Sequence, residues 1–259
     1  MDTEILLREG LLQIPCKVSE PEDGDIRRVV LGVHGFGGCM EDQIQRFIAE
    51  EMDMLHCATV RFDFPAHGIS PLESEDFTLQ NCLDILYAVA RYAKERFAQV
   101  EDLCIFATGF GAYITLLSLQ DLLELPGRLR LVVQTPSVLM HETLLSMVRV
   151  SRETLWAMDT ARINAPNRPF TVDYRFYEDL RENIALTTYP IPMLILMGED
   201  DSYIRMSDIQ QFRRINEQSK LVIIPGAGHQ FMEEGAWDMV LDLTRDWFEF
   251  QQVYLTDWL

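Results

Sequence analysis

The sequence is short of the features that mark disulfide-rich, membrane-spanning and exported proteins. Its five cysteines among 259 residues are odd in number, scattered and without CxxC spacing, so they do not form a disulfide framework of the usual kind. No run approaches the roughly 18 apolar residues that a membrane helix needs. The opening MDTEILLREG lacks the basic and apolar regions of a signal peptide. These absences predict a cytoplasmic protein with no membrane partner.

Basic residues are also scarce. Lysine and arginine number 22 against 41 aspartates and glutamates, which gives a formal net charge of −19. Nucleic acids and anionic membranes need clustered basic side chains, so the charge argues against both as partners. Hydrophobic residues make up 48% and charged residues 24%, which is ordinary for a globular protein that buries a core without disulfides or metal.

Strand-like and helix-like patterns alternate through most of the chain. Such alternation predicts an α/β fold with a mostly parallel sheet flanked by helices. The expected strands are 11–17, 28–34, 58–64, 102–107, 129–134, 193–197 and 220–224, and the expected helices are 41–55, 78–97, a segment running through Leu117, 207–217 and 235–250.

One segment interrupts this alternation and is interpreted as a cap. Residues 137–189 contain no strong buried strand, so we expect them to cover the carboxyl edge of a core made of 1–136 and 190–259. In RPFTVDYRFYEDLREN, apolar residues alternate before a charged stretch. We expect some of the cap's aromatic side chains to line an apolar pocket, although they could instead only pack the cap onto the sheet. The candidates are Trp156, Tyr174, Phe176 and Tyr177.

Two loops that follow predicted strands carry glycine and histidine. HGFGG, residues 34–38, can present backbone N–H groups to a ligand, and the Phe36 amide could be one donor of an oxyanion hole; an ordinary glycine turn is the alternative. In DFPAHGIS, residues 63–70, we expect Asp63 and Ser70 to bond the loop's own backbone. His67 is interpreted as a loop or surface histidine rather than a general base.

A third loop has the form of a nucleophile elbow without a nucleophile. FATGFGAY, residues 106–113, lies between a predicted strand and a predicted helix. Aligning its small residues puts Ala107 first, Gly109 in the centre and Gly111 last, and the central residue is the one that the turn exposes. The Phe110 amide would be the second oxyanion donor, but Gly109 has no side chain. A glycine-rich strand–helix turn is the alternative.

The last two loops supply an acid and a histidine. GEDDSYI follows the penultimate strand and GAGHQF follows the last one, which places Asp201 before His229. This is the chain order Ser…Asp…His of one class of hydrolase triads. Asp201 would hold the His229 imidazole in one tautomer and stabilise its protonated form.

With these five loops in order, the chain resembles the α/β-hydrolase superfamily over nearly its whole length. HGFGG, DFPAHGIS and the short cap look most like the small bacterial carboxylesterases that include cinnamoyl and feruloyl esterases. The resemblance implies cleavage of a carboxylic ester through an acyl-serine, with no metal and no cofactor. It also implies that Phe36 and Phe110 form the oxyanion hole, with Asp201 as acid and His229 as base. The chain departs from the pattern at Gly109, and also at Ala66, where the family usually has glycine.

The vacant position leaves three readings of the function open. The chain could be an ester hydrolase that has lost its nucleophile and most of its turnover. It could be a binding module for a small acyl or aromatic ester or its product, or a scaffold for protein contacts. Thr108, Cys39 and Ser137 fall near strand ends and are the candidates for a substitute nucleophile. The apolar tail with Tyr254, Leu255, Trp258 and Leu259 could pack onto its own domain or form the contact of a homodimer.

Overall fold

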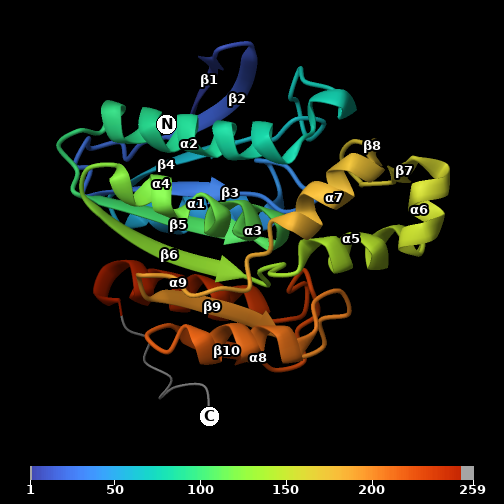
Figure 1. Ribbon diagram of the computed structural model, residues 1–259. Helices are drawn as coiled ribbons and strands as arrows, with labels where there is room; N and C mark the ends of the chain where they lie inside the picture. Colours follow the sequence, from blue (N-terminus) through green and yellow to red (C-terminus); the bar gives the residue numbers. More distant parts are fainter. Residues whose placement is uncertain (1, 252–259) are drawn as a thin grey trace.

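A twisted sheet of eight strands runs through the computed structural model, which describes residues 2–251. The strand order is β1-β2-β4-β3-β5-β6-β9-β10 (Figure 1). From β4 to β10 all neighbours pair in parallel, while β1 and β2 pair antiparallel at one edge. The strands are β1 (Asp2–Glu9), β2 (Leu12–Ser19), β3 (Arg28–Val33), β4 (Cys57–Phe62), β5 (Asp102–Thr108), β6 (Arg128–Gln134), β9 (Met193–Gly198) and β10 (Lys220–Ile224).

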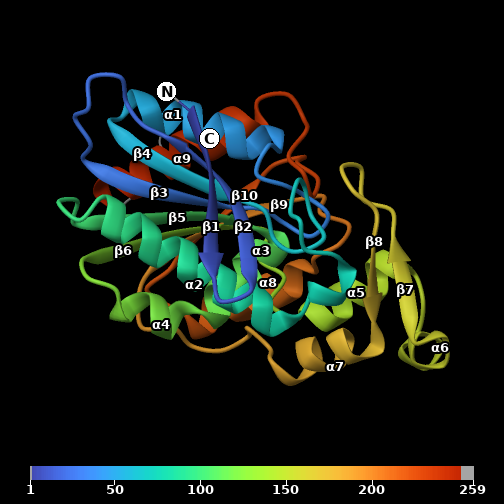
Figure 2. The same ribbon diagram turned by 90° about the horizontal axis from the view of Figure 1, so that it is seen from above.

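Helices cover both faces of this sheet, as the alternation of patterns predicts. Along β5, Leu103 and Ile105 belong to the hydrophobic cluster under one set of helices, and Cys104 and Phe106 belong to the cluster under the other. Because successive side chains of a strand point to opposite faces, a strand buried on both sides reads as a continuous apolar run. One face carries α1 (Gln43–Met54) and α9 (Ala236–Phe250); the other carries α2 (Leu79–Arg96), α3 (Gly109–Leu117), α4 (Leu119–Glu124) and α8 (Met206–Ile215) (Figure 2).

Of the N-terminal hairpin, β2 was expected as the strand over 11–17, but β1 was not among the expected elements. β1 pairs with β2 along its whole length, from Asp2 opposite Ser19 to Glu9 opposite Leu12. Its burial alternates only weakly, because β1 is an edge strand whose residues are exposed or half-buried. An edge strand has little apolar patterning to reveal it in the sequence.

The segment between β6 and β9 stands outside the sheet at the carboxyl ends of the strands, where a cap was expected (Figures 1 and 2). It is made of α5 (Met140–Val148), α6 (Arg152–Met158), the antiparallel hairpin β7 (Thr160–Ile163) and β8 (Phe170–Asp173), and α7 (Tyr174–Glu182). Of the alternating residues Val172, Tyr174 and Phe176, only Val172 lies in a strand. Asp173 caps α7 by accepting a hydrogen bond from the Phe176 amide at 2.7 Å, so Tyr174 and Phe176 lie in a helix.

Within the part of the chain that the structure describes, no helix is both long and apolar enough to cross a membrane. The apolar tail proposed for a dimer contact, with Tyr254, Leu255, Trp258 and Leu259, lies outside the described residues.

Candidate active site

The loops singled out in the sequence meet at the carboxyl edge of the sheet. They follow β3, β4, β5, β9 and β10, which are parallel neighbours or near neighbours. Parallel strands end at the same edge, and the loops beyond that edge are the usual place for ligands in an open α/β sheet.

Asp201 is fixed by three hydrogen bonds in the loop after β9. Its Oδ1 accepts from the amides of Tyr203 at 2.8 Å and Ile204 at 2.9 Å. Its Oδ2 lies 2.7 Å from Nδ1 of His229. The carboxylate side chain has no solvent-exposed surface, so all of its strong partners are within the protein. Such a carboxylate is held in one orientation by the turn that carries it.

This bond defines the state of the His229 ring. An ionised carboxylate only accepts hydrogen bonds, so Nδ1 carries the proton and its N–H donates a hydrogen bond to Asp201. Nε2 is then the free, basic nitrogen of the imidazole. The Tyr203 ring packs edge-on against His229 at 5.1 Å between centroids, and the His229 side chain remains 24% exposed.

Gly109 lies close to Nε2 of His229. An ideal Cβ placed on Gly109 would lie 4.0 Å from Nε2 and 4.0 Å from Cα of Gly35, with no other heavy atom as near outside its own chain neighbours and helix backbone. The φ of Gly109 is +49°, the left-handed conformation that strains other residues and that glycine adopts readily. The structure thus brings the glycine, the histidine and the acid together as the triad hypothesis requires.

The two expected oxyanion donors are the amide of Phe110, which follows Gly109, and the amide of Phe36, which follows Gly35, whose Cα lies 4.0 Å from the ideal Cβ of Gly109. Phe110 is the second residue of α3, so its N–H has no partner inside the helix. Among residues 2–251, neither the Phe110 N–H nor the Phe36 N–H takes part in a hydrogen bond. Gly111 allows the two loops to approach, because a Cβ there would collide with the carbonyl oxygen of His34. The role of Phe36 and Phe110 as an oxyanion hole stays a prediction.

A buried histidine holds the loop that carries Phe36. His67 is 1% exposed, so the interpretation of a surface histidine is wrong, although it does lie in a loop. Its Nε2 accepts a hydrogen bond from the Gly37 amide at 2.9 Å, and its Nδ1 lies 2.8 Å from the carbonyl oxygen of Pro65. Burial lowers the pKa of His67 to about 3, which keeps the imidazole neutral and able to accept that bond.

The loop after β4 is organised around Asp63. As expected, this carboxylate bonds its own loop through the Ile69 amide at 2.9 Å; it also accepts from the Met40 amide at 2.7 Å, and so ties two loops together. Ser70 Oγ accepts from the Leu72 amide at 3.4 Å. Ala66 has a φ of +61°, which explains physically why glycine is the usual residue there in the family that the sequence resembles.

An aromatic cluster adjoins the site, and sequence reasoning found only part of it. The Phe36 ring lies 5.7 Å from the Phe110 ring and 5.1 Å from the Phe170 ring of β8. Phe77 lies 5.5 Å from Phe110 and 4.9 Å from Phe176. Phe77 and Phe170 carried no signal because each is a single aromatic residue beside a helix or strand end.

The four aromatic residues expected to line a pocket have different surroundings. Phe176 packs into this cluster, and Tyr177 is buried against Tyr174 within the cap at 5.6 Å. The Tyr174 hydroxyl accepts a hydrogen bond from Arg152 at 3.0 Å. Trp156 is 68% exposed on α6, so it does not line an enclosed pocket, because nothing covers most of its ring.

A cavity of about 200 Å³ lies next to the loop that carries Asp201, and Gly109, His229, Phe36 and Phe110 are not among its lining residues. It lies between α5 and the loop after β9, and Ser137, Thr143, Tyr203 and Arg205 are among its lining residues. Ser137 connects it to the elbow, since its amide donates to the Gly109 carbonyl at 3.3 Å, and Tyr203 connects it to His229. The volume is below the 300–1,000 Å³ that is common for sites of drug-sized ligands.

The three candidates for a substitute nucleophile have different surroundings, and those of Cys39 disfavour the role. Burial, with Asp42 close by, raises the pKa of Cys39 to about 12, so its sulfur stays a thiol. Cys39 Sγ also accepts a hydrogen bond from Asn167 of the cap at 3.2 Å. The Thr108 hydroxyl lies against Gly35, 3.3 Å from where a Cβ would stand on that residue. Ser137 is 3% exposed and lines the cavity.

Over residues 2–251, no group of three or more histidine, cysteine, aspartate or glutamate side chains is arranged to hold a metal ion.

Comparison with known proteins places this geometry in a wider context. The model of the Alpha/beta hydrolase family matches residues 30–243. No curated protein sequence matches the chain.

Solved structures share the fold at low sequence identity. The Est1E structure from Butyrivibrio proteoclasticus with bound ferulic acid superposes with a TM-score of 0.81 at 20% identity, covering 95% of this chain and 98% of that one. A putative hydrolase from Agrobacterium vitis S4 gives 0.78 at 19% identity, with 95% and 97% covered. Mouse alpha/beta hydrolase domain-containing protein 10 gives 0.76 at 14% identity, with 96% and 100% covered. At these identities the likeness shows the fold, and it confirms the predicted fold class.

Proposed function

The chain belongs to the alpha/beta hydrolase family, and from that premise we propose that it binds a small carboxylic ester, or the acid released from one, without forming an acyl-enzyme. Its site is of the ester-hydrolase type, with Asp201 as the acid, His229 as the base and the amides of Phe36 and Phe110 as carbonyl-oxygen donors. The position of the nucleophile is Gly109.

The observation that carries the proposal is the space between Gly109 and His229. Nε2 of His229 lies 4.0 Å from where a Cβ would stand at residue 109. A hydroxyl on that Cβ would be within hydrogen-bonding reach of the base, but glycine provides none. Acyl transfer needs the nucleophile, whereas recognition of the ester carbonyl needs only the two amides, and these are unaffected by the missing side chain.

The size of the neighbouring cavity limits the size of the ligand that we expect. About 200 Å³ beside Ser137 and Tyr203 accommodates a short acyl chain better than a large aromatic acid. The Est1E structure holds bound ferulic acid; here the Phe36 and Phe170 rings pack against each other at 5.1 Å between centroids. We therefore expect butyrate and butyrate esters to bind more tightly than ferulic acid.

Melting temperature against ligand concentration tests the proposal. Butyrate and ethyl butyrate should raise the melting temperature progressively, because a ligand that binds only the folded state stabilises it by mass action. Release of butyrate from the ester should stay at the level of a His229→Ala variant. The absence of any shift with butyrate, its ester and ferulic acid would contradict the proposal, as would ester hydrolysis that His229→Ala abolishes.

A pair of variants locates the binding. Ser146 is exposed on α5 and lines the cavity, so Ser146→Trp should obstruct its mouth and remove the shift. Ser207 is an exposed serine on α8 that does not line it, so Ser207→Trp is the matched control and should leave the shift unchanged. An equal effect of the two substitutions would place the ligand elsewhere.

A further inference from the structure

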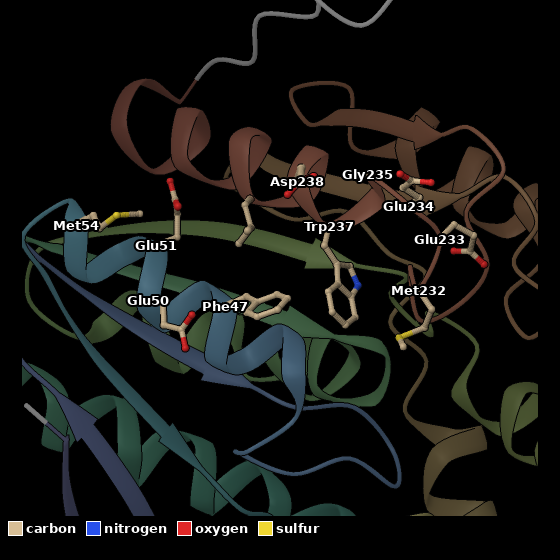
Figure 3. Close-up of a pocket in the computed structure, with 11 residues that line it drawn as sticks. Phe47, Glu50, Glu51, Met54, Met232, Glu233, Glu234, Gly235, Trp237 and Asp238 are labelled. Atoms are coloured by element: carbon tan, nitrogen blue, oxygen red, sulfur yellow. The ribbon is translucent and has the colours of Figure 1, made fainter.

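A second hollow lies away from the candidate active site, between α1 and the beginning of α9 (Figure 3). It has a volume of about 440 Å³. We call it the α1–α9 groove and define it by Phe47 and Met54 of α1, Met232 to Gly235 of the preceding loop, and Trp237 and Leu241 of α9. None of the residues assigned to ester binding lines it.

The floor of the groove is apolar and partly open to solvent. Phe47 and Trp237 pack edge to face with their ring centroids 5.1 Å apart, as Figure 3 shows between the two helices. Met54 and Met232 are 69% and 63% exposed at its margins. Methionine side chains adapt their shape to a partner, and exposed apolar side chains gathered at one place mark interaction surfaces.

The rim of the groove is acidic. Glu50, Glu233, Glu234 and Asp238 have no ion-pair partner among residues 2–251. Glu51 is paired with Arg245 at 3.4 Å, and that arginine also faces Asp242 at 2.8 Å and Asp246 at 3.7 Å. Arg245 is thus already surrounded by carboxylates, and within residues 2–251 no lysine or arginine is among the residues that line the groove.

From this combination we infer that the α1–α9 groove binds a basic amphipathic helix of a partner protein. An apolar floor with an acidic rim complements a helix with one apolar face bordered by lysine or arginine. From Phe47 to Met54 the groove follows eight residues of α1, about 10 Å of helix, which matches two turns of a docked helix. A second copy of this chain does not fit, because its formal net charge of −19 opposes the rim.

The groove also touches the loop that carries His229. Nε1 of Trp237 donates a hydrogen bond to the carbonyl oxygen of Gln230 at 3.1 Å, and Gln230 is the residue after His229. A helix packed on the Trp237 ring would therefore contact the side chain that is hydrogen-bonded to the His229 loop. The docking itself does not depend on the proposed function.

Fluorescence anisotropy with a labelled model peptide tests the inference on the full chain. The probe is a peptide of about 18 lysines and leucines at helical spacing, and the control peptide has the same composition in an order that gives no apolar face. We expect the first to bind with a dissociation constant below about 100 µM and the second at least tenfold more weakly. Equal binding of both would mean simple attraction to an acidic surface and would overturn the inference.

Matched variants then locate the peptide. Glu50→Lys with Glu234→Lys reverses charge at the rim, and Glu75→Lys with Glu124→Lys makes the same change at exposed positions elsewhere. Met54→Ser with Met232→Ser removes apolar surface from the groove, and Met158→Ser does so on the 56% exposed methionine of α6. Each groove pair should weaken binding at least tenfold and each control less than twofold. Binding that is unchanged in both groove pairs, with all variants folded by circular dichroism, would refute the site.

Discussion

Placing a serine at residue 109 is the most direct test of how the candidate active site is built. Gly109→Ser adds a Cβ whose nearest neighbours, apart from its own chain neighbours and helix backbone, are Gly35 Cα and His229 Nε2 at 4.0 Å, so no atom has to move. The hydroxyl extends one bond farther, which brings it within the roughly 2.6–3.2 Å of Nε2 that proton transfer requires. His229 would take the hydroxyl proton while Asp201, 2.7 Å from Nδ1, stabilises the imidazolium.

The cost to stability follows from the backbone. The φ of residue 109 is +49°, where a residue with a Cβ is strained. The strain should lower the free energy of unfolding by about 1 kcal/mol, and for a chain of this length the melting temperature should fall by roughly 2–4 °C. Since no contact is shorter than van der Waals distance, we expect no further steric cost.

The gain in activity should be large. Removing a triad nucleophile costs on the order of 10⁶ in kcat in a serine protease, so restoring one should raise kcat/KM on a short chromogenic ester by at least about 10³. An initial burst should accompany turnover, because an acyl-enzyme forms before it is hydrolysed. A phosphonate reagent should label the Gly109→Ser chain at that residue.

Gly109→Ala is the matched control, because it adds the same Cβ at the same φ without the hydroxyl. It should lose the same stability and gain no activity. Gly109→Ser combined with His229→Ala should also be inactive, since an unassisted serine hydroxyl is a poor nucleophile. A folded Gly109→Ser protein that hydrolyses no more ester than Gly109→Ala would refute the arrangement of base and oxyanion donors described above.

Three further predictions concern Asp201, His67 and the cysteines. In the Gly109→Ser background, Asp201→Asn should lower kcat by about 10³–10⁴. The side-chain oxygen of the asparagine would accept from the Tyr203 and Ile204 amides, so its NH₂ group would face His229 and impose the wrong tautomer. An unchanged kcat would show that the tautomer is set otherwise. His67→Ala should lower the free energy of unfolding by about 1–3 kcal/mol at pH 7, because the Gly37 N–H loses its acceptor. The pKa of His67 is about 3 in the folded state against an ordinary 6.5, so its contribution to stability is present above pH 6.5 and is lost by about 1.4 kcal/mol per pH unit as the pH falls. The difference in free energy of unfolding between parent and His67→Ala, measured in urea, should therefore shrink from pH 7 to pH 5. A difference that grows over this range would contradict the argument. All five cysteines are buried, with the pKa of Cys39 raised to about 12, so the native protein should resist iodoacetamide at pH 8 while the unfolded chain takes up five groups by mass spectrometry; alkylation of native Cys39 would show that the cap opens over it.

The sequence was informative where local pattern and burial coincide. β5 and β9 are buried on both faces and read as apolar runs, so they were located to within one residue. The helix over Leu79–Arg96 repeats apolar residues at helical spacing and begins at Thr78, whose hydroxyl accepts from the Asn81 amide at 3.1 Å. Where pattern and burial diverge, as in the exposed edge strand β1 and the α7 helix hidden in an alternating stretch, the prediction was incomplete or wrong.

The order of the five loop motifs, by itself, predicted the fold class and that Gly109, Asp201 and His229 would lie at one edge of the sheet. Parallel strands bring their following loops to one edge, so sequence order alone predicts which loops meet. Only the tertiary structure could decide what depends on long-range packing. It put Nε2 of His229 at 4.0 Å from the vacant side-chain position, and it buried His67 as the support of the Gly37 amide. It also left Trp156 exposed, assembled Phe77 and Phe170 beside the elbow, and formed the α1–α9 groove from helices far apart in the chain. Distances and burial of this kind arise from contacts between distant segments, and no local spacing in a sequence encodes them.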